Sequence, residues 1–107
     1  IDFNGQQIDG STENVLSLGN LHAKLEAFGW TVLEEKNGND LEAVIGILER
    51  AKTETGKGKP VVIILHTEMG NGVDYMMGTH AWHGKAPNDE QLDTAFKQLY
   101  LEAPADY

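Results

Sequence analysis

The chain has 107 residues, enough for one domain with a modest core. Its 17 acidic and 8 basic side chains give a net charge of −9. That excess argues against nucleic acid as a partner, because phosphate binding needs a clustered positive surface. The absence of cysteine excludes disulfides, thiolate nucleophiles and cysteine-ligated zinc. The longest apolar run, residues 61–65, is far shorter than the roughly 20 residues of a membrane span, and we expect a soluble, cytoplasmic protein without a membrane partner.

The first residues resemble the end of a strand. Residues 1–4 are apolar and then polar, and Asn4-Gly5 is typical of a turn. Because a domain rarely begins at such a point, we expect an upstream part to be missing, although a shortened chain explains the same observation. Residues 5–17 are polar and are predicted to be irregular.

A helix is predicted next, followed by a strand. Apolar residues recur at spacings of three and four, which places them on one face of a helix; they are Leu18, Leu21, Leu25 and Phe28. Gly29 follows where a C-terminal cap is expected. Residues 31–33 then favour a β-strand, which gives way to the polar residues 34–36.

The second helix and the strand after it determine the fold class. Asp40 is a suitable N-cap, and the predicted buried face of the helix is Leu41, Val44, Ile45, Leu48 and Ala51. Residues 61–65 are apolar at every position, as in a strand buried on both faces of a parallel sheet. We therefore predict an α/β fold with three αβα layers and a parallel sheet. Its central strand is residues 61–65, flanked by residues 1–4 and 31–33.

The remaining sequence contains a long segment and a final helix. Residues 66–87 include four glycines, and loops of this length are uncommon in compact domains unless they have a function. A helix is predicted from its cap at residues 88–90 to Leu99. The acidic pairs Glu34-Glu35 and Asp89-Glu90 are expected to be solvated or to cap helices.

Ligands of parallel sheets bind at the carboxyl ends of the strands. Two loops, residues 4–10 and 66–84, leave such ends, and they face one site if their strands are neighbours. Asn4 offers a side-chain oxygen and Gln6 a backbone carbonyl, and hard oxygen ligands of this kind suit Mg²⁺. The alternative is that Asn4 only satisfies the backbone of its turn.

The later loop contributes further candidates. At residues 69–72, Met-Gly-Asn-Gly, the backbone can approach a ligand closely, although most glycine turns are only turns. His83 follows Trp82 on this loop and is a candidate for phosphate binding or proton transfer, with a structural role as the alternative. His22 is predicted to be partly exposed on its helix, and His66 to be a capped histidine at the end of the central strand.

Four motifs together resemble the transketolase family. Residues 2–10, Asp-Phe-Asn-Gly-Gln-Gln-Ile-Asp-Gly, are similar to its Asp-Asn-Asn…Ile-Asp-Gly stretch, and residues 28–32 to its Phe/Tyr-Gly-Trp-x-Val. Residues 59–73 resemble the next cofactor loop. Residues 82–87, Trp-His-Gly-Lys-Ala-Pro, are similar to the Trp-His-Gly-x-Ala-Pro of split, two-subunit transketolases. The order and spacing hold over nearly the whole chain.

The resemblance implies that residues 1–107 form a single, incomplete domain, the second half of a thiamine-diphosphate-binding domain. It is closest to the N-terminal subunit of the split enzymes. In that family the asparagine matching Asn4 and the carbonyl at Gln6 bind Mg²⁺, which anchors the diphosphate. Ile8 and Met69 match positions against the thiazolium ring, with Gly70 in the same loop. His83 matches a histidine that contacts the diphosphate and assists proton transfer.

Several positions depart from the family pattern. The upstream Gly-Asp-Gly segment, which supplies another Mg²⁺ ligand, is absent, as is the pyrimidine-binding domain. Phe3 replaces the first asparagine of the usual pair. Met69 and Asn71 stand where the split enzymes commonly have lysines, and residues 37–40 differ from their Gly-His-Asp.

The resemblance implies a fragment or subunit of an enzyme that transfers a two-carbon ketol unit between sugar phosphates and is inactive alone. Its partners would be the upstream half-domain and the pyrimidine-binding domain or subunit. Two alternatives remain: a flavodoxin-like or receiver-like binding module, and a degenerate scaffold that ignores the cofactor. An uncovered sheet edge beside residues 1–4 and exposed apolar helix faces predict a homo-oligomer.

Overall fold

The computed structural model describes residues 1–99 and contains the predicted parallel sheet. The central strand β5 (Val61–His66) lies between β1 (Asp2–Phe3) and β4 (Thr31–Glu35), and it is parallel to both. This strand order confirms the α/β prediction. The strand β4 contains the predicted residues 31–33 and is longer by two residues, Glu34 and Glu35.

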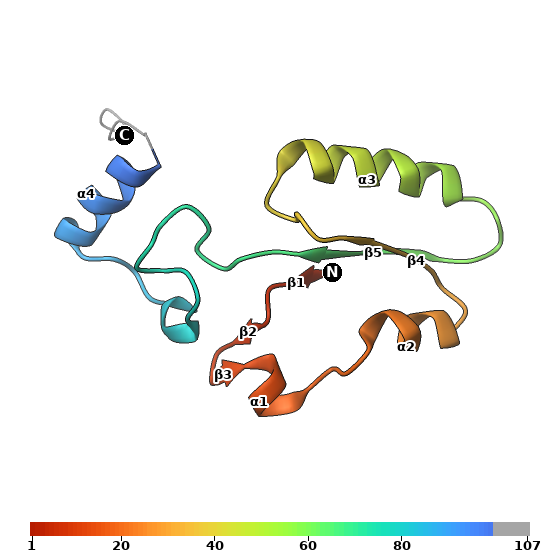
Figure 1. The fold of residues 1–107 in the computed structure, drawn as a ribbon, viewed down its shortest axis with the longest axis horizontal. Coiled ribbons are helices and arrows are strands. Elements are labelled where there is room, and N and C mark those ends of the chain that lie inside the picture. The colour runs from red at the N-terminus through yellow and green to blue at the C-terminus, as the bar shows by residue number, and fades with distance from the viewer. Residues whose placement is uncertain (100–107) are drawn as a thin grey trace.

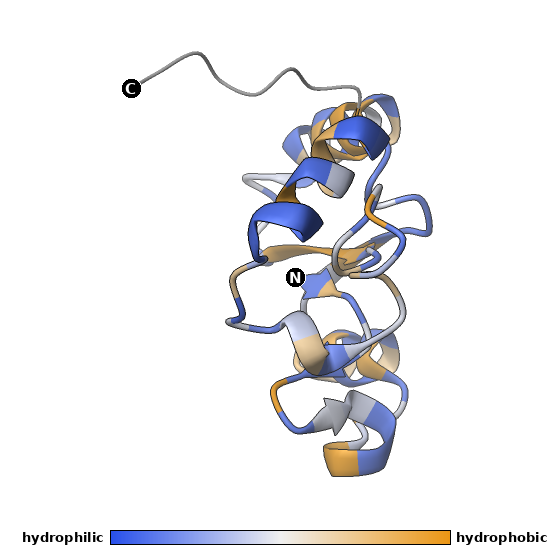
Figure 2. Cartoon of the chain, turned by 90° about the vertical axis from the view of Figure 1, so that its left-hand side faces the viewer, coloured by the Kyte–Doolittle hydropathy of each residue, from blue (hydrophilic) through white to orange (hydrophobic). Residues whose placement is uncertain are grey.

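Helices cover both faces of this sheet. Figure 1 shows α3 (Leu41–Glu54) on one side and α2 (Leu21–Ala27) on the other, which confirms the three αβα layers. Figure 2, seen from the side of the last helix, shows the hydrophobic strand between them. Ile64, in the middle of β5, is only 2% exposed, and Val62 and Ile47 are buried with it. The core is therefore centred on β5 and the adjacent face of α3.

The first predicted helix is shorter than its apolar spacing suggested. Asn20 accepts a hydrogen bond from the Ala23 amide through its side chain, so α2 begins after Leu18 rather than at it. Phe28 at the other end is 81% exposed. The predicted stripe therefore extends past both ends of the helix, because Leu18 precedes the Asn20 cap and Phe28 is the C-cap.

The N-cap of α3 is confirmed, but its buried face differs from the prediction. Asp40 Oδ1 accepts a hydrogen bond from the Ala43 amide at 2.7 Å. Ile47, which was not predicted to face the core, is the buried residue of this helix. The prediction was wrong for three exposed residues: Leu41, Ile45 and Leu48. This helix is apolar around more than one face, so spacing alone did not identify the face that packs on the sheet.

Residues 5–17, predicted to be irregular, contain regular structure. A small antiparallel pair forms between β2 (Gln6–Gln7) and β3 (Gly10–Ser11). A short helix, α1 (Thr12–Leu16), follows immediately, and Ser11 caps it by accepting from the Asn14 amide. The irregular prediction was wrong because strands of two residues carry no readable periodicity.

Residues 67–99 form a separate group of elements, here called the distal lobe. It contains the 3₁₀ turn η1 (His80–Trp82) and the helix α4 (Asp89–Gln98), and Figure 1 shows it beyond the carboxyl end of β5. Asn88 and Gln91 form a reciprocal capping box, which confirms the predicted helix start. Val73 and Ala95 are the buried apolar residues of this lobe.

The described part of the chain is extended for its size. Its radius of gyration is 17.2 Å, with principal extents of 50 × 32 × 22 Å. A compact domain of about this length has a radius near 13 Å. Few apolar side chains are buried, and many large ones are exposed. Among residues 1–99, no helix is long and apolar enough to cross a membrane.

Candidate functional site

Both candidate loops leave the same edge of the sheet. Asp2 pairs with Leu65 and Phe3 with His66 in the parallel register of β1 and β5. The Thr67 amide donates to the Phe3 carbonyl at 3.5 Å, just beyond the two strand ends. The loops that follow these strands therefore start side by side, as the sequence predicted for neighbouring strands.

Asn4 forms the turn after β1. Its Oδ1 accepts a hydrogen bond from the Gln6 amide at 2.9 Å, which is an Asx-type turn. The structural role considered for Asn4 is thus present in the fold. A carbonyl-type oxygen has two lone pairs, so this oxygen keeps the capacity for a second interaction.

The donor atoms at this turn fit part of a magnesium site. Asn4 Oδ1 and the Gln6 carbonyl are hard, neutral oxygens, and Mg²⁺ is usually bound by few protein groups together with phosphate and water. Within residues 1–99, no group of three or more histidine or acidic side chains is arranged to hold a metal ion. Next to the turn, Gln7 Nε2 is buried without a hydrogen-bond partner. Such a donor suits a phosphate oxygen.

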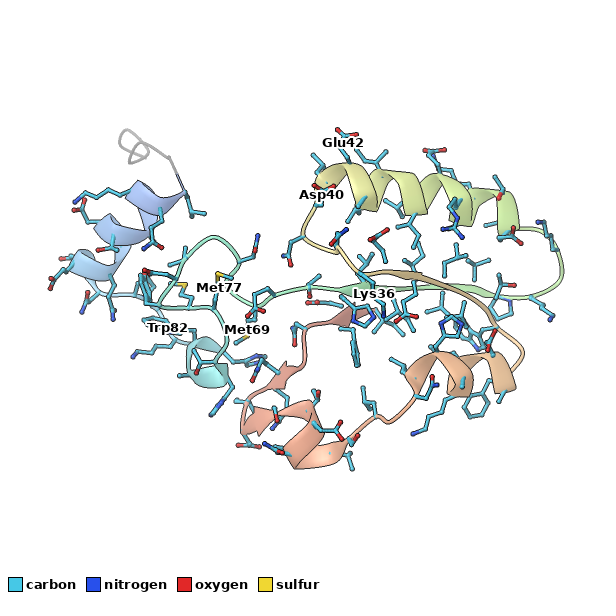
Figure 3. All side chains as sticks on the ribbon, in the orientation of Figure 1. Lys36, Asp40, Glu42, Met69, Met77 and Trp82 are labelled. Carbon is cyan, nitrogen blue, oxygen red and sulfur yellow. The ribbon has the colours of Figure 1, made fainter. Side chains whose placement is uncertain are left out.

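Ile8, Met69 and Gly70 occupy the two loops. Ile8 lies at the tip of the β2–β3 turn and is 64% exposed, whereas Met69 is half-buried after β5 (Figure 3). Gly70 has a φ of 72°. A Cβ at Gly70 would lie 2.5 Å from Met76 Cβ. The glycine is therefore required by packing within the loop, not only by a possible approach to a ligand.

His83 follows η1 in the distal lobe. Its side chain is exposed, and its backbone amide donates to the His80 carbonyl at 2.9 Å. The preceding Trp82 packs against Tyr75 with ring centroids 5.1 Å apart, and Lys85 Nζ lies 4.6 Å from the Trp82 ring (Figure 3). These contacts hold the backbone of the Trp-His-Gly motif while leaving the imidazole accessible.

A polar cluster around Glu34 was not predicted. Its carboxylate accepts from His22 Nδ1 at 3.1 Å, from His66 Nε2 at 2.5 Å and from Lys36 Nζ at 2.5 Å. The hydrogen bond from Lys36 is the main cause that lowers the pKa of Glu34 to about 2. The prediction that Glu34 is solvated or caps a helix was wrong, because its side chain joins β4 to His22 and His66. His22 is partly exposed, as predicted. His66 was predicted to be a capped histidine at the end of the strand, and its side chain is hydrogen-bonded to Glu34.

Two recesses border the end of β5. One of about 430 Å³ lies between α2 and the sheet, beside His22 and Glu34. The other, of about 500 Å³, lies between the ends of β4 and β5 and includes Asn39 and Glu68. Neither is lined by the six predicted site residues: Asn4, Gln6, Ile8, Met69, Gly70 and His83. Asn4, Gln6 and Ile8 lie in the segment after β1, whereas Met69, Gly70 and His83 lie in the distal lobe after β5.

Comparison with known proteins shows to which family this chain belongs. A family model described as the transketolase thiamine diphosphate binding domain matches residues 1–106. The chain belongs to this family. Its family cofactor is thiamine diphosphate, and the order of motifs from residues 2–10 to 82–87 is explained by common descent.

Individual relatives agree with this assignment. One subunit of the apulose-4-phosphate transketolase of Phocaeicola vulgatus is 42% identical over 99 residues, which is 92% of this chain and 34% of that subunit. The 6-deoxy-6-sulfo-D-fructose transketolase subunit SqwG of Clostridium sp. is 34% identical over 101 residues, which is 94% of this chain and 36% of that subunit. The resemblance to split transketolases is thus confirmed, and the chain spans about a third of the length of these subunits.

The fold of solved transketolases is also similar. The transketolase from Leishmania mexicana superposes with a TM-score of 0.83 at 33% identity, covering 94% of this chain and 15% of that one. The transketolase of Pichia stipitis in complex with sedoheptulose 7-phosphate gives a TM-score of 0.82 at 28% identity, covering 94% of this chain and 14% of that chain. The αβα arrangement is therefore that of the family.

Proposed function

We propose that this chain is a fragment or subunit of a transketolase that transfers a two-carbon ketol unit between sugar phosphates. The observation that carries the proposal is the family match over residues 1–106, together with the two loops that leave adjacent strands at one edge. Thiamine diphosphate, when bound, supplies the nucleophilic carbon for this chemistry. The residues of this chain would bind and orient it.

Asn4 and Gln6 would hold a magnesium ion, which would supply positive charge for binding the diphosphate. The Asx turn fixes the Asn4 side chain on the Gln6 amide at 2.9 Å, so its oxygen is oriented before any ligand arrives. Preorganised ligands lose little entropy on binding. The nearby unpartnered Gln7 Nε2 adds a donor of the right kind for a phosphate oxygen.

Ile8 and Met69 would form the apolar contacts with the thiazolium ring, beside Gly70. Exposed Ile8 and half-buried Met69 come from the two adjacent loops. Covering them would remove apolar surface from water, at roughly 25 cal/mol per Å². His83, exposed after its 3₁₀ turn, would contact the diphosphate and move a proton at the substrate hydroxyls.

The proposed partners are the remaining parts of a transketolase. Relatives that are named as single subunits of a transketolase imply a partner subunit in those enzymes. The extended shape of the described residues and the exposed apolar side chains of α3 support contacts with further protein. We also expect a homo-oligomer, since β5 is the one strand that pairs with β1 among residues 1–99. Location in the cytoplasm stays a prediction.

A degenerate scaffold is the second candidate function. It is favoured by one observation: neither recess at the end of β5 is lined by a predicted site residue. In that case the chain would fold and associate without recognising the cofactor.

Calorimetric titration of thiamine diphosphate with Mg²⁺ into the chain separates the two functions. We expect binding that weakens about tenfold or more in Asn4→Ala and His83→Ala, because each loses a contact to a charged group. His80→Ala is the matched control, since His80 is also exposed, lies three residues before His83 and has no proposed contact. Binding that is equal in all four proteins would contradict the site, and no heat would show that these residues alone do not recognise the cofactor.

Sedimentation at micromolar concentration tests the assembly. We expect a species of at least twice the 11.7 kDa mass of the chain. A single monomeric boundary would contradict the homo-oligomer and leave cofactor binding to be decided by the titration.

A further inference from the structure

Residues 68–78 form a closed loop directly after β5. Glu68 Oε1 accepts a hydrogen bond from the Gly78 amide at 2.7 Å, which joins the two ends. Inside the loop, the Val73 amide donates to the Gly70 carbonyl at 3.0 Å and the Met76 amide to the Val73 carbonyl at 2.9 Å. A compact loop with adjacent ends, packed by its own side chains, is an Ω-loop.

Glu68 is itself held by the neighbouring β4–α3 connection. Its amide donates to Asn39 Oδ1 at 2.6 Å. In the same connection, the amide of the preceding residue, Gly38, donates to the His66 carbonyl at 2.8 Å. A Cβ at Gly38 would lie 2.6 Å from that carbonyl oxygen, so the two backbones are in direct contact. The start of the loop is thus fixed to the end of the sheet.

The middle of the loop is fixed to α4. Val73 is buried, and the Asp74 amide donates to Gln98 Oε1 at 2.9 Å. These contacts hold the part of the loop farthest from β5. The two residues of the proposed cofactor site, Met69 and Gly70, lie between this anchor and the Glu68 end.

We propose that Glu68, held by Asn39, is a positioning residue that fixes Met69 and Gly70 for cofactor contact. The proposal rests on the proposed function. The Glu68 side chain accepts from the Gly78 amide, and without that acceptor the two ends of the loop are no longer joined. Gly70 has a φ of 72°, and a Cβ at this position would lie 2.5 Å from Met76 Cβ. Its backbone therefore packs directly against Met76 when the loop is closed.

The proposal concerns a residue that touches neither cofactor nor substrate. Asn39 stands in the segment where this chain departs from the Gly-His-Asp pattern, so the pair Asn39–Glu68 is a feature of this sequence rather than of its motifs. Glu68 also lines the recess of about 500 Å³ between β4 and β5, away from the six site residues.

Methyl and amide NMR of the full chain without cofactor tests the positioning. The chain has three methionines, Met69, Met76 and Met77, which give three methyl signals. In Glu68→Ala we expect the Gly78 amide to exchange about tenfold faster and the Met69 methyl to lose order. Glu68→Gln should retain both properties, because its amide oxygen can still accept from Gly78. Glu42→Ala, an exposed change on α3, is the matched control.

Asn39→Ala provides a second route if Glu68→Ala does not fold. It removes the acceptor of the Glu68 amide and should raise Gly78 exchange in the same direction by a smaller factor. The decisive quantities are the exchange rate of the Gly78 amide and the order of the Met69 methyl group. If both stay within twofold of the parent chain in whichever of these variants folds, the proposal is overturned.

Cofactor titration then separates failure of this proposal from failure of the proposed function. We expect Glu68→Ala to weaken thiamine diphosphate binding about tenfold and Glu68→Gln to stay within twofold. Equal affinity in the parent chain and Glu68→Ala would overturn positioning. No binding by the parent chain would instead show that these residues alone do not hold the cofactor, while the NMR result still decides whether Glu68 fixes Met69 and Gly70.

Discussion

The sheet region, residues 1–66, and the distal lobe, residues 67–99, are stabilised in different ways. In the sheet region, Ile47, Val62 and Ile64 pack between parallel strands and helices. In the distal lobe, Val73 and Ala95 are the buried apolar residues, and polar contacts also connect the segments, such as the hydrogen bond from the Tyr75 hydroxyl to the Gln91 carbonyl at 2.7 Å. Glu68 closes the loop in the same manner.

This difference predicts unequal stability in the two regions. Apolar burial is non-directional and grows with the area removed from water. A hydrogen bond contributes only about 0.5–1.5 kcal/mol net, because water competes for its partners. Regions with few buried apolar contacts open locally at lower free energy than the core. We therefore expect the loop that contains Met69 and Gly70 to be less stable than the sheet from which it extends.

Ile64→Ala should have the largest effect. Ile64 is 2% exposed in the central strand, and removing such a side chain costs about 2–5 kcal/mol of unfolding free energy through lost burial and a cavity. Urea unfolding monitored by circular dichroism measures the change. Ile45→Ala is the matched control, since Ile45 is 45% exposed on α3. We expect it to cost less than about 1 kcal/mol, and equal costs would refute the core assignment.

Gly38→Ala tests the junction between the two regions. Its new Cβ would lie 2.6 Å from the His66 carbonyl oxygen, and overpacking of this kind costs about 1–3 kcal/mol. Gly46→Ala is the control, because Gly46 lies within α3 with no atom near its added Cβ. That change should stabilise the helix by about 0.5–1 kcal/mol. Thermal melting of both variants gives the comparison, and opposite shifts are the expected result.

The sequence predicted the parts of the fold that depend on local chemistry or on composition. An apolar residue at every position of 61–65 is enough to identify a strand buried on both faces. Asp40 and Asn88 were recognised as caps because a cap bonds to an amide only three residues away. The adjacency of the two candidate loops followed from the parallel sheet, since neighbouring parallel strands end at one edge.

The features that the sequence did not predict depend on contacts between distant residues. Glu34 meets His66 across 32 positions, and Asn39 meets Glu68 across 29. No local pattern encodes either pair. The same limit applies to α3, where apolar residues surround the helix and only the packed sheet shows that Ile47 is the buried one. Asn4, Gln6 and His83 were candidates because of their own chemistry, whereas the cofactor contacts of Ile8 and Met69 came from motif resemblance, because open loops have no periodicity to interpret.

Glu34 should make the sheet region sensitive to acid. Hydrogen bonds, chiefly from Lys36, lower its pKa from 4.5 to about 2 in the folded chain. A folded-state pKa below the unfolded value means that the ionised carboxylate stabilises the fold. This stabilisation is complete above about pH 4.5 and is lost as the pH falls toward about 2. Glu34→Gln should therefore be less stable than the parent chain at pH 7, with a difference that shrinks in acid.

We expect this difference to be about 1 kcal/mol at pH 7, the smallest of the three effects, because solvent screens the contacts. Glu34 is 26% exposed and Lys36 is 69% exposed, and exposed ion pairs contribute little. Urea midpoints of both proteins at pH 7, 4.5 and 3 measure the trend, with Asp9→Asn as a control for an exposed carboxylate outside the helices. A difference that stays constant between pH 7 and pH 3 would mean that Glu34 acts through packing instead of charge. The end of the sheet around Glu34 would then be stabilised by packing, as its apolar centre is, and not by polar contacts of the kind found in the distal lobe.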